Sequence, residues 1–322
     1  MRLRLVVLCW LLKVNALFTE PLSFVGRDFF DWAYAHCNHK TEHAIYDALR
    51  NHPLLSKVTC LEIPWEGVIN ARRERHGGDL LIKALRGRDI SKVRFSVCGN
   101  LGYKSILGIL QKCGVSHFFV TQCYKRKFGK MECIPILFVP LIECRPAEHK
   151  DILYSFVGIA WSHRIRRKLF RLPRKGDVRL IRRPYWASDH QGFETKKRER
   201  AEYAKIAGRS RFGLCPRGLG LNTIRLSELL QAGTIPVIIA DGIRLPVGVD
   251  WKKCAVFVRE CDVMKVDKII RAIPLDVEDL MRQECLRIGA MLDDDPAYFV
   301  RYYFENVWSG RRELCDDTVA AA

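Results

Sequence analysis

The sequence predicts a two-lobed α/β protein that ends in a helical tail. Its 322 residues are 48% hydrophobic, which suffices for a sizeable core, and chains of this length commonly form about two domains. Short apolar runs alternate with helical stretches along most of the chain, a pattern typical of parallel strands covered by helices. These observations exclude a disordered or fibrous protein.

The first lobe is expected over residues 18–148. Its apolar run 134–141 predicts a last strand, and the polar stretch 143–151 is typical of a linker. The other elements expected here are helices at 41–50 and 105–113 and strands at 58–63, 93–98 and 117–121.

The second lobe is expected over residues 149–295, with a helix and tail at 296–322. A strand at 152–157, a turn at Gly158 and a helix at 164–171 open it, and a strongly basic region extends to Arg211. The basic run 196–200 is most simply the solvated face of a helix. The remaining expected elements are strands at 212–215, 235–240 and 255–258 and helices at 223–232, 277–288 and 297–308.

The net charge of the chain calls for an acidic partner or surface. Lysine and arginine outnumber aspartate and glutamate by 54 to 36, a formal charge of +18. Nucleic acid, an anionic membrane and a phosphorylated metabolite all satisfy this charge. Because the basic residues are spread from Arg2 to Arg312 without a nucleic-acid-reading motif, we expect no nucleic-acid partner.

Residues 1–17 allow two interpretations. Eight apolar residues, Leu5 to Leu12, follow two arginines, as in a short signal peptide or anchor. The same run would serve as a buried first strand, since it is far shorter than the roughly 20 residues that span a bilayer. The first interpretation places the protein in the Golgi or secretory lumen, associated with the membrane through its N-terminus, and the second places it in the cytoplasm.

The cysteines give little information about metals or disulfides. All thirteen are scattered without a CxxC pair, which weakly indicates a reduced chain. His36, Cys37, His39 and His43 could supply metal ligands, but their spacing matches no structural zinc pattern. A polar helix start is the simpler interpretation.

A strand followed by a glycine-containing turn and a helix predicts a phosphate site. The strand before Pro216 delivers Arg217 and Gly218 to the carboxyl edge of the sheet, where open α/β sheets bind ligands. Asn222 or Thr223 is expected to cap the next helix, so that free backbone amides face an anion such as a diphosphate.

Arg225 and Glu228 lie three residues apart near the start of that helix. A guanidinium there can bind phosphate, and a carboxylate can accept hydrogen bonds from ribose hydroxyls. An exposed intrahelical ion pair is the alternative for these two residues alone. The turn before them favours the binding interpretation.

The stretch 212–236 resembles the signature of the exostosin family of glycosyltransferases, family 47. In that signature a Pro-Arg-Gly turn precedes an Arg-Phe-Leu-Glu-like helix and a Pro-Val-like strand. This chain has Pro-Arg-Gly at 216–218, Arg-Leu-Ser-Glu at 225–228 and Pro-Val at 236–237. The segments 154–158 and 162–169 are similar to the family's strand, glycine turn and arginine-bearing helix, whereas the first lobe resembles the family only faintly.

The resemblance implies an inverting transferase of the GT-B architecture, with two Rossmann-like lobes facing a central cleft. Such an enzyme uses a nucleotide-sugar donor, a glycan or glycoprotein acceptor and no metal or other cofactor. The compact chain looks most similar to small exostosin-like transferases of microbes and algal viruses, which suggests xylose as the sugar. The donor-site residues implied are Gly158, His163, Arg166, Pro216, Arg217, Gly218, Asn222, Thr223, Arg225 and Glu228.

Within that set the arginines at 166, 217 and 225 would meet the diphosphate and Glu228 would hold the ribose. For His163, capping of the helix at 164–171 is the competing interpretation. Departures from the pattern, the Leu-Gly-Leu-Asn turn at 219–222 among them, argue against heparan-type polymer synthesis.

An inverting transfer needs a base for the acceptor hydroxyl. Glu66 and Asp79, in predicted loops of the first lobe, are the candidates, although each is also explained as a surface carboxylate. Trp65 and Trp161 could stack on acceptor rings, although burial is commoner for tryptophan. The alternatives left open are another GT-B transferase such as a fucosyltransferase, and a non-catalytic glycan- or nucleic-acid-binding protein.

Overall fold

The computed structural model describes residues 41–70, 93–184 and 193–310. Contacts within the chain define two compact units. Unit 1 comprises Met1–Thr121 and Lys125–Ile134, and unit 2 comprises Gln122–Tyr124 and Pro135–Ala322. The main boundary thus follows residue 134, earlier than the predicted one after residue 148. The predicted segment 1–17 lies outside the described residues.

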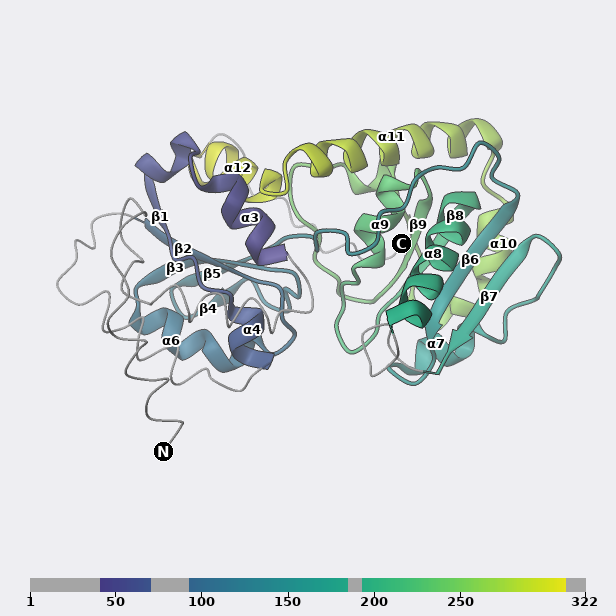
Figure 1. The fold of residues 1–322 in the computed structure, drawn as a ribbon, viewed down its shortest axis with the longest axis horizontal. Coiled ribbons are helices and arrows are strands. Elements are labelled where there is room, and N and C mark those ends of the chain that lie inside the picture. Colours follow the sequence, from purple (N-terminus) through teal and green to yellow (C-terminus); the bar gives the residue numbers. More distant parts are fainter. Residues whose placement is uncertain (1–40, 71–92, 185–192, 311–322) are drawn as a thin grey trace. The chain divides into compact units, whose positions relative to one another are not determined.

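Unit 1 contains a five-stranded sheet of order β1-β2-β3-β5-β4 (Figure 1). The pairs β1–β2 and β2–β3 are parallel, and β4–β5 is an antiparallel hairpin. Phe95, Phe118 and Phe119 are fully buried in its core. The strands are β1 (Val58–Cys60), β2 (Val93–Cys98), β3 (Val115–Val120), β4 (Lys127–Phe128) and β5 (Met131–Pro135), and the helices are α3 (Thr41–Leu49), α4 (Trp65–Asn70) and α6 (Leu107–Lys112).

Unit 2 contains a five-stranded sheet of order β10-β9-β8-β6-β7, in which every pair is parallel. Its central strands consist almost entirely of buried residues, as expected for strands covered on both faces. The strands are β6 (Ile152–Ile159), β7 (Val178–Arg183), β8 (Ser210–Pro216), β9 (Ile235–Ile239) and β10 (Val256–Phe257).

Helices cover the sheet of unit 2 (Figure 1). They are α7 (Arg164–Leu169), α8 (Phe193–Arg209), α9 (Arg225–Gln231), α10 (Val266–Arg271), α11 (Leu275–Asp294) and α12 (Tyr298–Tyr302), which continues as a π-helix over Tyr303–Trp308. Among the described residues, no helix has both the length and the apolar character needed to cross a bilayer.

Most expected strands and helices are present. The short elements β4, α4 and α10 were not predicted, and other differences concern individual segments. The strand predicted at 134–141 is wrong, because β5 ends at Pro135 and the next residues form no strand. Gly158 lies inside β6, paired with Arg182, and not in a turn after it. The basic region before Arg211 contains β7, which we did not predict, and α8, of which only the run 196–200 was interpreted as a helix face.

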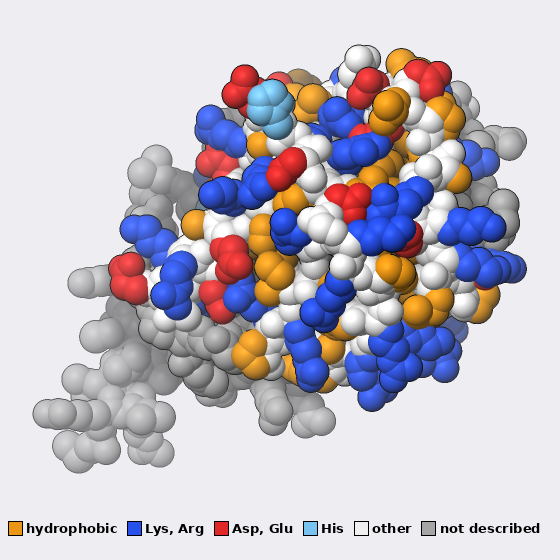
Figure 2. All heavy atoms as spheres, turned by 90° about the vertical axis from the view of Figure 1, so that its right-hand side faces the viewer, with side chains coloured by type: hydrophobic (Ala, Val, Ile, Leu, Met, Phe, Trp, Pro, Cys, Tyr) orange, Lys and Arg blue, Asp and Glu red, His pale blue; other side chains and the backbone are white. Residues whose placement is uncertain are grey.

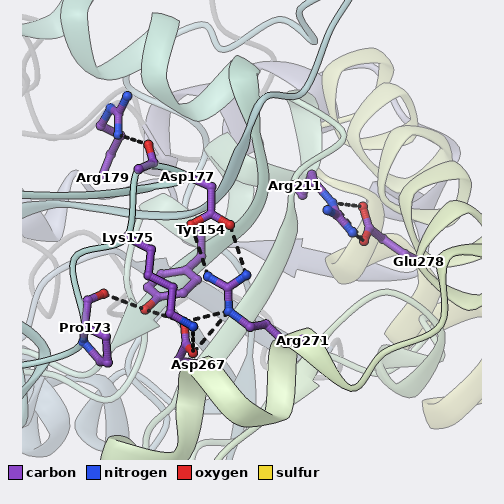
Figure 3. A network of polar contacts seen from close by, with 10 residues as sticks. Tyr154, Pro173, Lys175, Asp177, Arg179, Arg211, Asp267, Arg271 and Glu278 are labelled. Atoms are coloured by element: carbon purple, nitrogen blue, oxygen red, sulfur yellow. Dashed lines mark hydrogen bonds and ion pairs between the residues drawn. The ribbon is translucent and has the colours of Figure 1, made fainter.

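Ion pairs gather at the amino ends of the strands of unit 2 (Figure 3). Arg271 on α10 binds Asp177, just before β7, with N–O distances of 3.0 and 3.1 Å. It also binds Asp267, which accepts a hydrogen bond from the Tyr154 hydroxyl at 3.2 Å. Lys175 lies 3.6 Å from Asp267 as well. Arg271, Lys175 and Arg211 at this edge therefore have carboxylate partners, whereas Arg179 donates to backbone carbonyls.

Candidate functional site

The candidate site lies at the opposite, carboxyl edge of the unit 2 sheet, where the strand order reverses. From β6 the chain continues to β7 on one side, whereas β8 pairs with β6 on the other side and leads to β9 and β10. Such a switch point leaves a crevice outside the carboxyl ends of the two central strands, where open α/β proteins bind ligands. Here those ends are Ile159 and Pro216, each followed by a loop and a helix.

Arg166, in the first turn of α7, is buried against the turn after β8. It is 7% exposed, and its Nε and Nη2 donate to the carbonyls of Arg217 and Pro216 at 3.0 and 3.3 Å. A Cβ at Gly218 would lie 2.9 Å from Nη2, so a larger residue there would require the Arg166 guanidinium to shift. Burial and the neighbouring charge of Arg225 lower the pKa of Arg166.

Arg225, the first residue of α9, provides a second buried guanidinium. Its Nη2 donates to the carbonyl of Val157 at 2.5 Å, and its Nε and Nη1 are buried without a hydrogen-bond partner among the described residues. The guanidinium carbon lies 4.7 Å from the ring centre of Phe156, and that of Arg166 lies 5.7 Å from the same centre. One aromatic ring therefore contacts two cations.

Within the described chain, neither arginine has a carboxylate oxygen within 4.0 Å. A buried charge is costly unless it is paired and hydrogen-bonded. Two such charges beside one ring, with unused N–H donors, favour the binding of an anion with several oxygens.

Glu228 is buried one turn further along α9. It is 3% exposed and accepts the backbone N–H of Ile142 at 3.2 Å. Burial raises the pKa of this carboxyl, whereas the Tyr203 hydroxyl and the charge of Arg225 lower it. Tyr203, on α8, faces the carboxylate without a hydrogen bond of normal geometry. The site thus combines two buried cations with one buried anion.

Arg217 extends the pairing of β8 beyond Pro216, because its N–H donates to the carbonyl of Ile239 at 2.9 Å. Its guanidinium is a quarter exposed, and Nη1 lies 3.5 Å from Oε1 of Glu260. The backbone of the turn is therefore fixed, while the side chain lies at its rim.

His163 caps α7, as the competing interpretation had it. Its Nδ1 accepts the N–H of Ile165 at 3.4 Å. Burial and the charge of Arg217 lower its pKa. A contact of His163 with donor phosphate stays a prediction.

The predicted capping of α9 by Asn222 or Thr223 is wrong. The helix begins two residues later than expected, after Ile224, which makes no side-chain capping bond. Asn222 instead exchanges two backbone hydrogen bonds with the side chain of Gln122, at 3.0 and 2.9 Å. Its side chain fixes the turn, with Nδ2 donating to Ile136 at 3.4 Å.

Sequence reasoning missed three residues of this site. The Ser162 hydroxyl is buried, has no hydrogen-bond partner among the described residues, and lies 3.5 Å from the place of a Cβ at Gly218. Ser162 lies in the segment 162–169 that carries the resemblance, so the sequence could have indicated it as a site residue. Phe156 and Tyr203 contact Arg225. No sequence motif near Tyr203 predicts this contact.

In unit 1, Glu66 lies in helix α4 and not in a surface loop. It is 2% exposed. Its N–H donates to both carboxylate oxygens of Glu42, at 3.0 and 3.1 Å. Burial and the charge of Glu66 raise the pKa of Glu42. The other candidate base, Asp79, lies outside the described residues.

The two tryptophans considered for sugar stacking differ. Trp65 is fully buried, and its Nε1 donates to the hydroxyl of Ser96 at 2.9 Å, so the stacking prediction is wrong for this residue. Trp161, just before α7, is 56% exposed.

In the described parts of the chain, no group of three or more His, Cys, Asp or Glu side chains could hold a metal. Of the cluster noted above, only His43 is described, and it lies 2.9 Å from Asp47. The described cysteines are free thiols, and all but Cys261 are buried.

The parallel sheet and its switch point define unit 2 as a Rossmann-like α/β unit. Residues 138–273 match the Exostosin GT47 domain, so this part of the chain is similar to the exostosin family of glycosyltransferases.

Curated relatives match only part of the chain. A probable glucuronosyltransferase of Oryza sativa subsp. japonica is 39% identical over 112 residues, covering 33% of this chain and 25% of the relative. Exostosin-1 of Drosophila melanogaster is 32% identical over 149 residues, which cover 42% of this chain and 20% of the relative. A probable beta-1,4-xylosyltransferase of Arabidopsis thaliana is 39% identical over 102 residues, which cover 30% of this chain and 24% of the relative. The aligned part thus spans about a quarter or less of each relative.

Proposed function

We propose that the protein is an inverting glycosyltransferase of the GT-B type, which moves a sugar from a nucleoside diphosphate to a glycan acceptor. The observation that carries the proposal is the pair of buried guanidinium groups, Arg166 and Arg225, at the switch point of unit 2. They have no carboxylate partner in the described chain, and a diphosphate would supply the missing negative charge.

The donor diphosphate is held by the two unused N–H donors of Arg225 and by Arg166 beside Gly218. Negative charge grows on the diphosphate as the bond to the sugar breaks, and fixed cations stabilise it most in that transition state. Because arginines perform this task, we propose that transfer needs no metal. Transfer that persists in excess chelator supports this part, and loss that manganese restores contradicts it.

Glu228 is proposed to accept hydrogen bonds from the ribose hydroxyls. It follows Arg225 by three residues on α9, so the two side chains lie on one side of the helix. Its backbone partner, Ile142, holds the carboxylate in place. The nucleoside would thus extend from the arginines toward this carboxylate.

The acceptor base is proposed to come from unit 1, with Glu66 as the first candidate and Asp79 as the second. Glu66 is the first candidate because its carboxyl group lies buried beside that of Glu42, which accepts the backbone N–H of Glu66. Glu66→Gln should keep nucleotide affinity and lose transfer. Full transfer by this variant would remove Glu66 from the mechanism.

The sugar is proposed from the relatives, whose names include glucuronosyl- and xylosyltransferases. UDP-xylose is the first donor to test and UDP-glucuronate the second. Thermal shift reveals binding, because a ligand specific for the folded state raises its apparent stability. Mass spectrometry of a glycan acceptor then detects transfer, and a chain that binds no nucleotide sugar contradicts the function.

A further inference from the structure

A cationic surface lies along α7 of unit 2. Residues 161–184 contain ten lysines and arginines but a single acid, Asp177. Arg164, Arg167 and Lys168 stand at positions i, i+3 and i+4 of α7 and therefore occupy one side of the helix. The α7 basic face is defined here as the exposed cations Arg164, Arg167 and Lys168 of α7 and Arg171 and Arg174 after it, without the exposed Lys175, which faces Asp267.

The α7 basic face lacks internal partners. None of its five cations forms an ion pair with any residue for which the structure gives a position. The only acid of the segment, Asp177, is bound by Arg271, and the neighbouring cation Lys175 faces Asp267 (Figure 3). Lysine and arginine side chains lie next to one another without intervening acids over the lower right of the surface in Figure 2.

Helix α8 shows what an ordinary solvated basic helix looks like in this protein. It carries Lys197, Arg198 and Lys205 on its exposed positions, but three glutamates are interspersed. Two of them, Glu199 and Glu202, pair with Arg183 of β7. The α7 basic face has no carboxylates among its cations. Cations three or four residues apart on a helix repel one another.

We propose that the α7 basic face binds a linear acidic polysaccharide through the carboxylate or sulfate groups of that chain. A polyanion along the helix offsets the mutual repulsion of the five cations and releases counterions. The inference goes beyond the proposed function, because this binding requires neither the donor nucleotide nor sugar transfer.

A polysaccharide fits this position better than a lipid bilayer. The first turn of α7 carries Arg166 and follows His163, so the helix borders the carboxyl edge of the sheet. A bilayer resting on α7 would cover the edge at which a water-soluble donor must arrive. A single polymer chain occupies the outer side of the helix and leaves that edge open.

The test compares two variants that each lose three positive charges from unit 2. One is Arg167→Gln/Arg171→Gln/Arg174→Gln on the α7 basic face, and the matched control is Lys197→Gln/Arg198→Gln/Lys205→Gln on α8. The probe is a size-defined oligogalacturonate, whose binding is followed by calorimetry at low and at physiological ionic strength. We expect the α7 variant to bind about tenfold or more weakly and the α8 control to bind like the wild type.

UDP binding separates this inference from the proposed function. The α7 variant should bind UDP normally, because its three residues lie outside the donor site. Equal loss of oligogalacturonate affinity in both variants would show unspecific charge attraction and overturn the proposal. Tighter binding through α7 to phosphatidylserine vesicles, or to single-stranded DNA, than to the oligogalacturonate would also overturn it.

Discussion

Replacement of Arg225 by lysine tests the donor site most directly, because the charge is kept and the planar fork is removed. In the structure one nitrogen of Arg225 binds the carbonyl of Val157, and two further nitrogens are unused. Lysine would satisfy Val157 with one N–H and could offer the diphosphate a single point contact. It would also lose the planar contact with Phe156, whose ring centre is 4.7 Å away.

The expected loss follows from the number of contacts. A hydrogen bond to a charged group contributes about 1.5–3 kcal/mol, so loss of one of two phosphate contacts weakens UDP binding roughly 10- to 150-fold. Isothermal titration calorimetry at constant ionic strength measures this change. Thermal unfolding should change little, since only the contact with the ring is lost, about 0.5–2 kcal/mol.

Arg271→Lys is the matched control. Arg271 forms two-pronged bonds with Asp177 at the amino edge of the same sheet, so its replacement should reduce stability and leave UDP affinity unchanged. If Arg225→Lys binds UDP like the wild type, its guanidinium does not meet the diphosphate. If both variants weaken binding equally, the effect is one of net charge.

Three further variants test other parts of unit 2. Ser162→Ala removes a buried hydroxyl that has no partner in the described structure, so it should lower UDP affinity about tenfold without a loss of melting temperature; a stability loss with unchanged affinity would assign Ser162 to the fold. Lys150→Met removes Nζ from four acceptors at 2.9–3.0 Å, on Gly208, Ser210, Ala232 and Thr234, and calorimetry should show about 2–4 kcal/mol lower stability. Burial raises the pKa of Glu228, so the folded chain holds more protons than the unfolded chain between the two pKa values, and the stability from this group falls as pH rises through that window. Glu228→Gln should therefore melt higher than the wild type at neutral pH, with a difference that disappears in acid, and should bind UDP more weakly; a pH-independent difference would contradict the buried, ionised carboxylate.

The donor side was predictable because its information is local. The strand, the Pro-Arg-Gly turn and the two charged residues at 225 and 228 follow one another within 20 residues. Strand β8 is buried and pairs with β6 at the switch point. The residues that follow these two strands, Arg217 and Arg225 after β8 and Arg166 after β6, therefore lie at the same edge of the sheet. Sequence spacing did not reveal the ring of Phe156 between two cations, since side-chain contacts across strands depend on the sheet order.

The basic region before Arg211 hid two elements because charge obscured its periodicity. In β7 the buried residues Val178 and Leu180 flank the exposed Arg179, but this alternation ends at Ile181, too early for a clear pattern of period two. Helix α8 is polar along most of its length, and its contribution to the site is Tyr203. Tyr203 stands 22 residues before Arg225, so only the folded chain brings them together.

The apolar run 134–141 shows why hydrophobicity alone cannot distinguish a strand from another buried segment. Ile136, Leu137 and Phe138 are buried, yet no strand pairs with them. Side chains of the donor region provide the missing backbone hydrogen bonds: Asn222 donates to Ile136 at 3.4 Å and Ser227 donates to Phe138 at 2.5 Å.

The same segment also supplies the N–H that holds Glu228, from Ile142. Buried backbone groups must find partners somewhere, and here they find them on α9 and the turn before it. Polar residues on α9 therefore serve two purposes, since they close the backbone of 136–142 and orient the carboxylate proposed for the ribose. A substitution such as Ser227→Ala should consequently disturb nucleoside binding through the position of this segment, although Ser227 itself is 1% exposed and bonded to Phe138.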